Sequence, residues 1–231
     1  MSAALFLVGW LLSRLALIND RPLGKPALSI VAASQAAVSF IAFGVTAGAA
    51  VAALIALLLL FCHERWLSRW LLEARFVSAA VMIGLVLGAE AAGLAPAEAW
   101  LPIPAQWRDG VWIGIGLLLV ANEINFVIRL LFRVFDLEPR QHHGAGATSG
   151  DLDERAYNAG RVIGILERWL MYSVLVVSDE YAVIAVVVAA KGFARFRQLD
   201  QREFAEYVLI GTLASTLFTI WVARAIRLGL G

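Results

Sequence analysis

The chain has 231 residues, of which 61% are apolar and only 16% are charged, and its mean hydropathy is +0.79. Soluble domains are roughly 45–50% apolar and about 25% charged, so this chain has too few polar residues to cover a water-soluble fold. Six prolines and 19 glycines without a regular period exclude collagen and a disordered chain. The composition predicts an all-α, polytopic transmembrane bundle, and we expect one transmembrane domain over residues 1–231.

The charge and the cysteine content limit the kinds of ligand and partner that the chain can have. The 19 Lys and Arg residues nearly balance the 18 Asp and Glu residues, so no net field favours nucleic acid as a partner. The single cysteine, Cys62, excludes an intrachain disulfide and a cysteine-based zinc site. His142 and His143 fit a solvated loop pair better than a metal site. We therefore expect no metal and no cofactor, with membrane lipids as neighbours and a homo-oligomer left open.

The expected spans follow from apolar runs long enough to cross a ~30 Å hydrocarbon core. One run, 28–62, would form a helix ~52 Å long at 1.5 Å per residue, which exceeds that core. Gly44 and Gly48 lie near its middle, so we divide it into spans 28–43 and 47–62. The result is about eight spans, or seven if 28–62 is one bent helix. The other six cover 2–18, 76–94, 110–132, 161–178, 181–196 and 204–226.

Orientation follows from the basic residues, which favour the cytoplasmic side of a membrane. With eight spans, 15 of the 19 Lys and Arg residues fall on one side. This asymmetry places the connections 63–75, 134–160 and 197–203 in the cytoplasm and 95–109 outside. The segment 134–160 is rich in Gly, Ser, His and charge, and we expect a flexible cytoplasmic loop there.

Ionisable residues at membrane depth are the candidates for chemistry, because a charge at a span centre costs roughly 2.5–3.5 kcal/mol without a partner. Arg161 and Arg168 are seven residues apart and share a helix face, with Glu167 at its edge. A tight turn at 179–180 would bring Lys191 level with Glu167, each roughly 18 Å from the turn. We predict a Glu167–Lys191 ion pair, with Arg168 adding net positive charge.

Three further features belong to this region. Gly160 and Gly164 form a small-xxx-small pair, which predicts a close contact with another helix. Glu206 enters the last span about one turn from its cytoplasmic end. A stripe of hydroxyl side chains then follows along that helix: Thr212, Ser215, Thr216 and Thr219.

A second candidate lies in the span 110–132, where Glu123 follows Asn122 near the middle. Helical periodicity puts Glu123 about 100° away from Asn122. A lone buried carboxylate is protonated or pairs with an excess cation, for example Arg168.

Three segments occur in a fixed order in the C-terminal third: GRVIGILER (160–168), AAKGFARF (189–196) and EYVLIGTLAS (206–215). This succession resembles the pattern GRxIGxLER, AAKxxxRF, EYxLIGTxxS of an uncharacterised bacterial integral membrane-protein family, a domain of unknown function. Members of that family often begin with a His- and Asp-containing helix, which this chain lacks. The resemblance implies a multi-pass protein of the bacterial inner membrane and no established activity. It also adds weight to the polar positions of the three motifs: Arg161, Glu167, Arg168, Lys191, Arg195 and Glu206.

Three functions remain open. The buried Arg/Lys/Glu cluster could bind or move an anionic small molecule or a lipid headgroup, as a transporter or channel does. In a non-catalytic envelope assembly protein, the same cluster would only hold helices together. An intramembrane lipid-modifying enzyme would use Glu123 or Glu167 as general base, but no nucleophile–base pair has plausible spacing, so we name no catalytic residue. The candidate ligand-binding residues are Arg161, Glu167, Arg168, Lys191, Arg195, Glu206, Glu123 and Asn122.

Overall fold

The computed structural model describes residues 2–18, 22–67, 70–93, 104–135, 150–196 and 202–230. These residues form helices and short connections, and none of them lies in a strand. They divide into two compact units, Met1–Phe126 and Val127–Gly229, and each unit is described by itself. An all-α fold is confirmed, whereas the single transmembrane domain expected over 1–231 stays a prediction.

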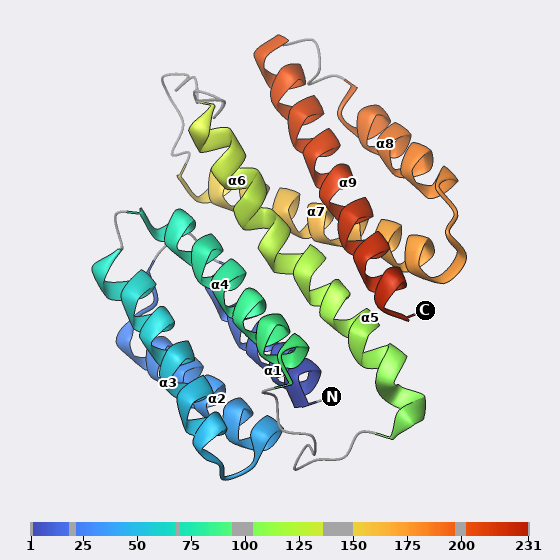
Figure 1. The fold of residues 1–231 in the computed structure, drawn as a ribbon. Helices are drawn as coiled ribbons and strands as arrows, with labels where there is room; N and C mark the ends of the chain where they lie inside the picture. The colour runs from blue at the N-terminus through green and yellow to red at the C-terminus, as the bar shows by residue number, and fades with distance from the viewer. Residues whose placement is uncertain are drawn as a thin grey trace. The chain divides into compact units, whose positions relative to one another are not determined.

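The first unit contains five α-helices and the start of a sixth (Figure 1). They are α1 (Ser2–Arg14), α2 (Lys25–Phe43), α3 (Ala47–Phe61), α4 (Leu71–Ala91), α5 (Arg108–Leu118) and α6 (Ile124–Val134). A 3-10 turn, Leu15–Ile18, follows α1. Two π-helical turns matter below: η2 (Cys62–Trp66) extends α3, and η5 (Leu119–Glu123) joins α5 to α6.

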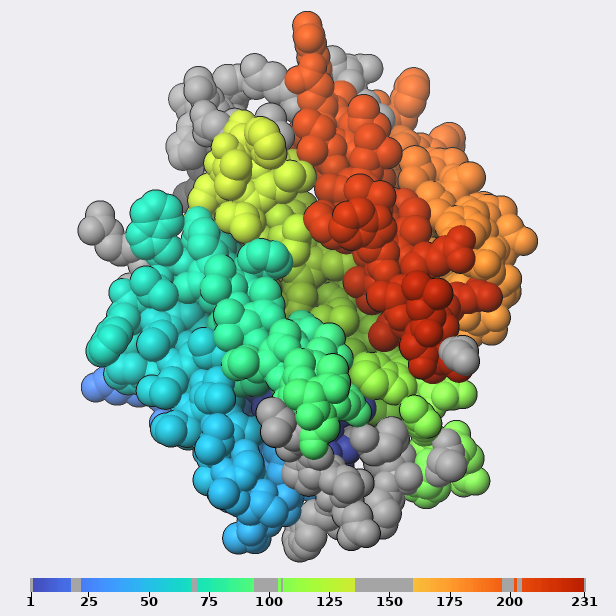
Figure 2. All heavy atoms as spheres, viewed as in Figure 1, coloured from blue at the N-terminus to red at the C-terminus, as the bar shows by residue number. Residues whose placement is uncertain are grey.

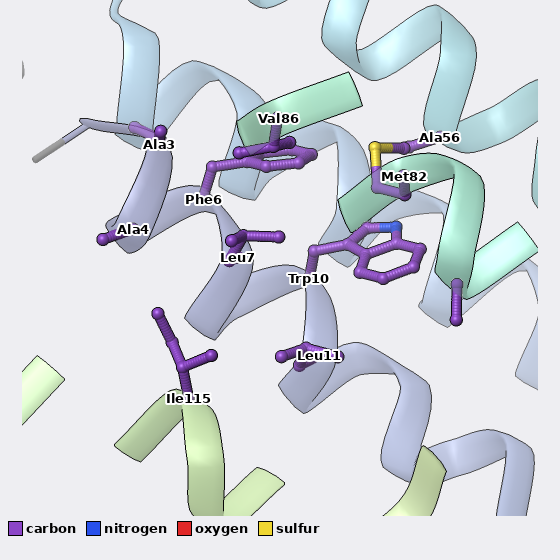
Figure 3. Close-up of a cluster of buried hydrophobic side chains, with 12 residues drawn as sticks. Ala3, Ala4, Phe6, Leu7, Trp10, Leu11, Ala56, Met82, Val86 and Ile115 are labelled. Atoms are coloured by element: carbon purple, nitrogen blue, oxygen red, sulfur yellow. The ribbon is translucent and has the colours of Figure 1, made fainter. Parts of the chain in front are cut away.

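Helix α1 lies at the centre of this unit. Eight of its 13 residues are buried, and it contacts α2, α4 and α5. Phe6, Leu7 and Trp10 form the core with Met82 from α4 and Ile115 from α5 (Figure 3). Between its two ends α1 has no polar side chain on any face, and a helix of this kind is expected in the middle of a bundle.

The run 28–62 is broken at Gly44, as the sequence predicts. Gly44 has φ +68° and ψ −169°, a conformation that is essentially restricted to glycine. Helix α3 then begins after Thr46, whose side chain accepts a hydrogen bond from the Ala49 N–H at 3.1 Å. The break converts one overlong run into two helices of 19 and 15 residues.

The second unit contains the rest of α6 with α7 (Gly150–Ser178), α8 (Ala182–Ala194) and α9 (Arg202–Leu230). The predicted turn between α7 and α8 is confirmed: Asp179 adopts φ +56°, and its N–H bonds to the Leu175 carbonyl. Helix α7 begins earlier than expected. Residues 150–160 are helical, whereas the sequence analysis assigned them to the 134–160 loop. Residues 136–149 of that loop lie outside the described residues.

Five helices are long and apolar enough to cross a membrane, which identifies the chain as a multi-pass membrane protein. They are Lys25–Phe43, Ala47–Trp66, Leu71–Ala91, Arg108–Val134 and Ala205–Leu230. Large apolar side chains are exposed on them, for example Leu54 and Leu58 on α3. Figure 2 shows the surface of α3 and α4 in cyan to green. The number of eight spans and their orientation stay predictions.

The Gly44 break yields a stability prediction. Gly44→Ala places a Cβ on a backbone conformation that only glycine tolerates, so we expect the free energy of unfolding to fall by about 1–3 kcal/mol. Gly84→Ala is the matched control, since nothing lies within 4 Å of the Cβ it would add inside α4. That control should be neutral or slightly stabilising. Denaturant unfolding in detergent measures both, and equal losses would contradict the assignment.

Candidate functional site

A buried ion pair joins α1 to the α5–α6 helix in the first unit. The Arg14 Nε lies 2.7 Å from Glu123 Oε1, and its Nη2 lies 3.0 Å from Glu123 Oε2. Only 1% of the Arg14 side chain and 10% of the Glu123 side chain are exposed. Two parallel N–H···O bonds of this kind are the strongest geometry available to an arginine and a carboxylate.

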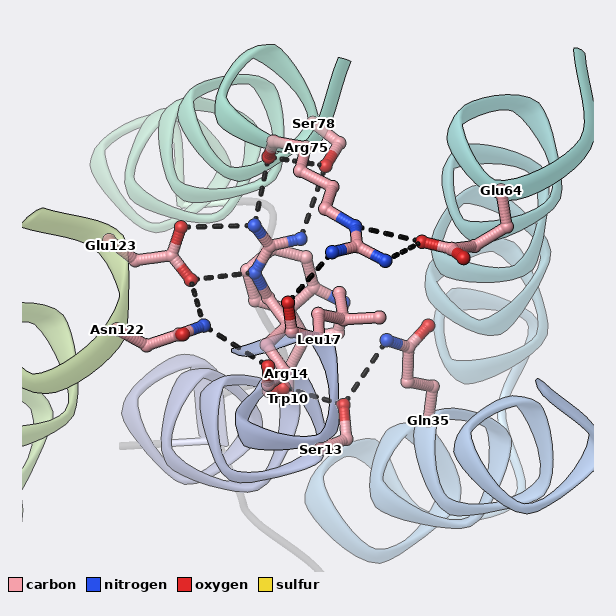
Figure 4. A network of polar contacts seen from close by, with 10 residues as sticks. All are labelled: Trp10, Ser13, Arg14, Leu17, Gln35, Glu64, Arg75, Ser78, Asn122 and Glu123. Atoms are coloured by element: carbon pink, nitrogen blue, oxygen red, sulfur yellow. Dashed lines mark hydrogen bonds and ion pairs between the residues drawn. The ribbon is translucent and has the colours of Figure 1, made fainter. Parts of the chain in front are cut away.

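A second ion pair joins α4 to the end of α3. The Arg75 Nε and Nη2 atoms donate to Glu64 Oε1 at 2.8 and 2.6 Å, and both side chains are fully buried. The two pairs are connected, because Arg14 Nη2 donates to the Arg75 carbonyl at 2.8 Å and Arg14 Nη1 to Ser78 Oγ at 3.1 Å (Figure 4). We call these linked residues the Arg–Glu network: Arg14, Glu64, Arg75, Ser78, Asn122 and Glu123.

The Arg–Glu network also satisfies backbone groups at the end of α1. Asn122 Nδ2 donates to the Arg14 carbonyl at 3.1 Å, and Arg75 Nη1 donates to the Leu17 carbonyl at 2.8 Å. The Leu23 N–H, just before α2, donates to Glu64 Oε2 at 2.7 Å. The last carbonyls of a helix have no intrahelical donor and need such partners wherever water is excluded. The network therefore stabilises the α1–α2 connection in addition to pairing the buried charges.

Both carboxylates of the network lie on π-helical turns, Glu64 in η2 and Glu123 in η5. A π-turn is wider than an α-turn and shifts the direction of the side chains that follow. This explains why Asn122 and Glu123, which are neighbours in sequence, both bond to Arg14. The α-helical spacing used in the sequence analysis does not apply there. Glu123 does pair with a cation, but that cation is Arg14 and not Arg168.

The charges of this network cancel. Two guanidinium groups face two carboxylates, and the Arg14 guanidinium also lies 4.8 Å from the centre of the Trp10 ring. His63 adds a contact of 3.1 Å between its Nδ1 and Glu64 Oε1. A balanced, hydrogen-bonded pair is how a protein keeps charges away from water. This balance fits a role in holding the helices together.

The second unit contains the predicted Glu167–Lys191 ion pair. Lys191 Nζ lies 2.7 Å from Glu167 Oε2 across the α7–α8 hairpin, and both side chains are about one-fifth exposed. Arg168 is buried, with 3% exposure, and its Nη1 lies 3.4 Å from Ser215 Oγ on α9. Glu167 and Lys191 lie at similar distances from the 179–180 turn along their helices, and this spacing predicts their ion pair correctly.

The two glycines of α7 lie beside arginine side chains. A Cβ added at Gly164 would lie 3.4 Å from Arg168 Nη1, and one at Gly160 would lie 3.7 Å from Arg195 Nη2. Within the part of the chain that the structure describes, no backbone of a neighbouring helix lies within 4 Å of either added Cβ. The predicted close contact of these two glycines with a neighbouring helix stays a prediction. The glycines leave room for guanidinium groups along α7.

A close helix contact occurs at Gly211 of α9. A Cβ there would lie 2.9 Å from Phe132 Cζ of α6, and Phe132 also stacks on Tyr207 with ring centres 4.4 Å apart. The hydroxyl stripe of α9 is buried as well, and Thr212 and Thr219 donate to carbonyls of their own helix. Gly211 therefore packs closely against the Phe132 side chain of α6.

Glu206 does not join the cluster around Arg168. Its side chain is 57% exposed and pairs with Arg202, one turn earlier on α9, at 2.8 Å. Arg161 and Arg195 are both half-buried. We call the other candidate charged residues of this hairpin the α7–α8 cluster: Arg161, Glu167, Arg168, Lys191 and Arg195.

The geometry disfavours either carboxylate as a general base. Both oxygens of Glu123 accept hydrogen bonds from Arg14, and Glu167 is paired with Lys191. No three His, Cys, Asp or Glu side chains gather as metal ligands among the described residues, and His142 and His143 lie outside them.

Comparisons of the chain with protein-family models, with curated proteins and with solved structures find no match. The resemblance of the three C-terminal motifs to a bacterial membrane-protein family therefore stays a prediction.

Sequence reasoning missed Arg14, Glu64 and Arg75 as site residues, and it counted both arginines among the cytoplasmic charges. A signal for Arg14 was present, since it interrupts an apolar run and a charge there requires a partner. Nothing in the sequence separates Glu64 and Arg75 from the other charges of the α3–α4 connection.

A double-mutant cycle tests the Arg14–Glu123 pair. Arg14→Met or Glu123→Gln alone leaves an uncompensated buried charge, and each should cost about 3–5 kcal/mol of unfolding free energy. The double variant should lose clearly less than the sum of the two. Glu206→Gln, which breaks an exposed pair, is the control and should leave the unfolding midpoint unchanged. Strictly additive losses would show that the two charges do not interact.

The Gly211 contact gives a second stability test. Gly211→Ala pushes a methyl group against the Phe132 ring, and overpacking of this kind typically costs ~1–3 kcal/mol. Gly192→Ala in α8 is the control, because its added Cβ meets nothing within 4 Å. We expect the thermal midpoint in detergent to fall for position 211 only. An equal midpoint for the two variants would place Gly211 away from α6.

Proposed function

We propose that the chain is a multi-pass protein of the bacterial inner membrane that binds an anionic group at the α7–α8 cluster. The group is a phosphate, carried by a lipid headgroup or by a small molecule. The observation that carries this proposal is the position of Arg195. Its guanidinium group lies beside Gly160, where an added Cβ would be 3.7 Å from Nη2, and it forms no ion pair with any residue that the structure describes.

The contrast with the Arg–Glu network supports this view. In the network each of the two guanidinium groups is paired with a carboxylate, whereas the Arg195 guanidinium of the cluster is paired with none of the described carboxylates. Positive charge in a low-dielectric environment attracts an anion strongly, because little solvent screens it. The cluster thus has the electrostatics of an anion site, and the network has those of a structural element.

The shape of the cluster fits phosphate. Gly160 and Gly164 leave space beside the guanidinium groups of Arg195 and Arg168. Arginine offers a planar fork of N–H donors that matches phosphate oxygens. Arg195 forms no ion pair with any residue that the structure describes, so its donors remain available to a ligand.

The depth of the cluster fits a headgroup. Arg161 lies 18 residues before Asp179, roughly 27 Å along α7 at 1.5 Å per residue. The hydrocarbon core is ~30 Å thick, so a turn at one interface places Arg161 close to the other. The orientation predicted from the basic residues makes that interface the cytoplasmic one, where anionic lipids attract Lys and Arg.

One observation favours the assembly role. Lys191 is already paired with Glu167, as expected for a cluster that only joins α7 to α8. The two functions differ in what Arg195 does, because a purely structural cluster has no need for a guanidinium that pairs with none of the described carboxylates.

Lipid titration by native mass spectrometry tests the proposal. Purified protein is titrated with phosphatidylglycerol and, separately, with phosphatidylcholine. We expect preferential retention of phosphatidylglycerol, weakened at least about fivefold by Arg195→Gln, which corresponds to ~1 kcal/mol. Arg224→Gln, at the exposed end of α9, is the control and should bind as the wild type does.

Competition with inorganic phosphate separates the two sources of the anion. Displacement of phosphatidylglycerol by millimolar phosphate would indicate a site that also accepts small anions, and resistance would indicate a headgroup site. Equal affinity for both lipids, or no effect of Arg195→Gln, would overturn the proposal and leave the assembly role.

A further inference from the structure

An apolar pocket of about 330 Å³ lies within the first unit, formed by α1, α3, α4 and the last residue of α2. Its walls include Ala3 and Phe6 of α1, Ala52 of α3, and Met82 and Val86 of α4. Every lining residue is apolar or glycine, so the pocket offers no hydrogen-bonding side chain. Three of the lining side chains, Phe6, Met82 and Val86, are labelled in Figure 3.

Small residues create this space. Gly48 and Ala52 line it from α3, and Ala3 and Ala89 line it from α1 and α4. Elsewhere α1 packs closely against α2, since a Cβ at Gly9 would lie only 2.7 Å from Val38. Protein interiors are normally filled to the density of organic crystals, and an unfilled space loses the dispersion contacts of its walls. An occupant is therefore favoured.

The pocket opens toward the surface that faces lipid. Two of its lining residues, Val51 and Leu85, are 55% and 49% exposed, and both belong to helices long and apolar enough to cross a membrane. The surroundings of a membrane-spanning helix are hydrocarbon rather than water. Water is also a poor occupant, because an apolar cavity offers it no polar partners.

We infer that this pocket, the α1–α4 pocket, binds one acyl chain of a membrane phospholipid. The volume of about 330 Å³ is enough for a stretch of an acyl chain but not for a helix from a second protein. A single helical turn, about 5.4 Å long and about 10–12 Å across with its side chains, takes up roughly 420 Å³ or more. The inference is independent of the proposed anion site, which lies in the other unit.

Photocrosslinking tests this inference in nanodiscs of palmitoyl-oleoyl phosphatidylglycerol. A small fraction of the lipid has a diazirine in the middle of its palmitoyl chain, and labelled peptides are identified by mass spectrometry. We expect labelling of residues 51–55 and 82–86 to exceed that around the exposed Leu58 severalfold. Ala52→Phe, which fills the pocket, should reduce this excess to the level at Leu58.

Two further variants keep the result interpretable. Ala50→Phe adds the same ring at an exposed position of α3 and should leave the labelling unchanged. Gly48→Leu fills the pocket from its other side and replaces Ala52→Phe if that variant fails to fold. Labelling equal to that at Leu58 in the wild type, or persistence of the excess in a folded filled variant, would overturn the inference.

Discussion

A charged group removed from water must meet an opposite charge, and the first unit is arranged around this constraint. Helix α1 is only about 20 Å long, and Arg14 lies in its last turn. The Arg14 charge and the backbone carbonyls at the helix end, which lack an intrahelical donor, therefore both lie inside the unit. Glu123, Arg75 and Asn122 converge on that point from helices that are distant in sequence. These contacts fix the end of α1, and the core around Trp10 packs against the rest of that helix.

The same constraint gives the Arg–Glu network and the α7–α8 cluster different charge pairing. In the network, each of the two guanidinium groups has its carboxylate, and the remaining donors bind carbonyls or a hydroxyl. In the cluster, Glu167 pairs with Lys191, while the Arg195 guanidinium lies beside Gly160 and pairs with none of the described carboxylates. This contrast in charge pairing supports the proposed anion site at the cluster and a structural role for the network.

Local rules in the sequence predicted the helices, the Gly44 break and the Glu167–Lys191 pair, because each depends on composition, backbone freedom or equal distance from one turn. They failed where geometry is set by distant contacts. The partner of Glu123 lies 109 residues away and is reached through a π-turn, which helical periodicity does not anticipate.

Electron cryomicroscopy of the protein in phosphatidylglycerol nanodiscs, at a resolution that shows headgroups, tests the central claim most directly. We expect phosphate density in contact with the Arg195 and Arg168 guanidinium groups. At the Arg–Glu network we expect direct Arg14–Glu123 and Arg75–Glu64 contacts and no phosphate density. Carboxylate side chains neutralising Arg195 and Arg168 with no phosphate present, or phosphate bound at Arg14 in place of Glu123, would contradict it.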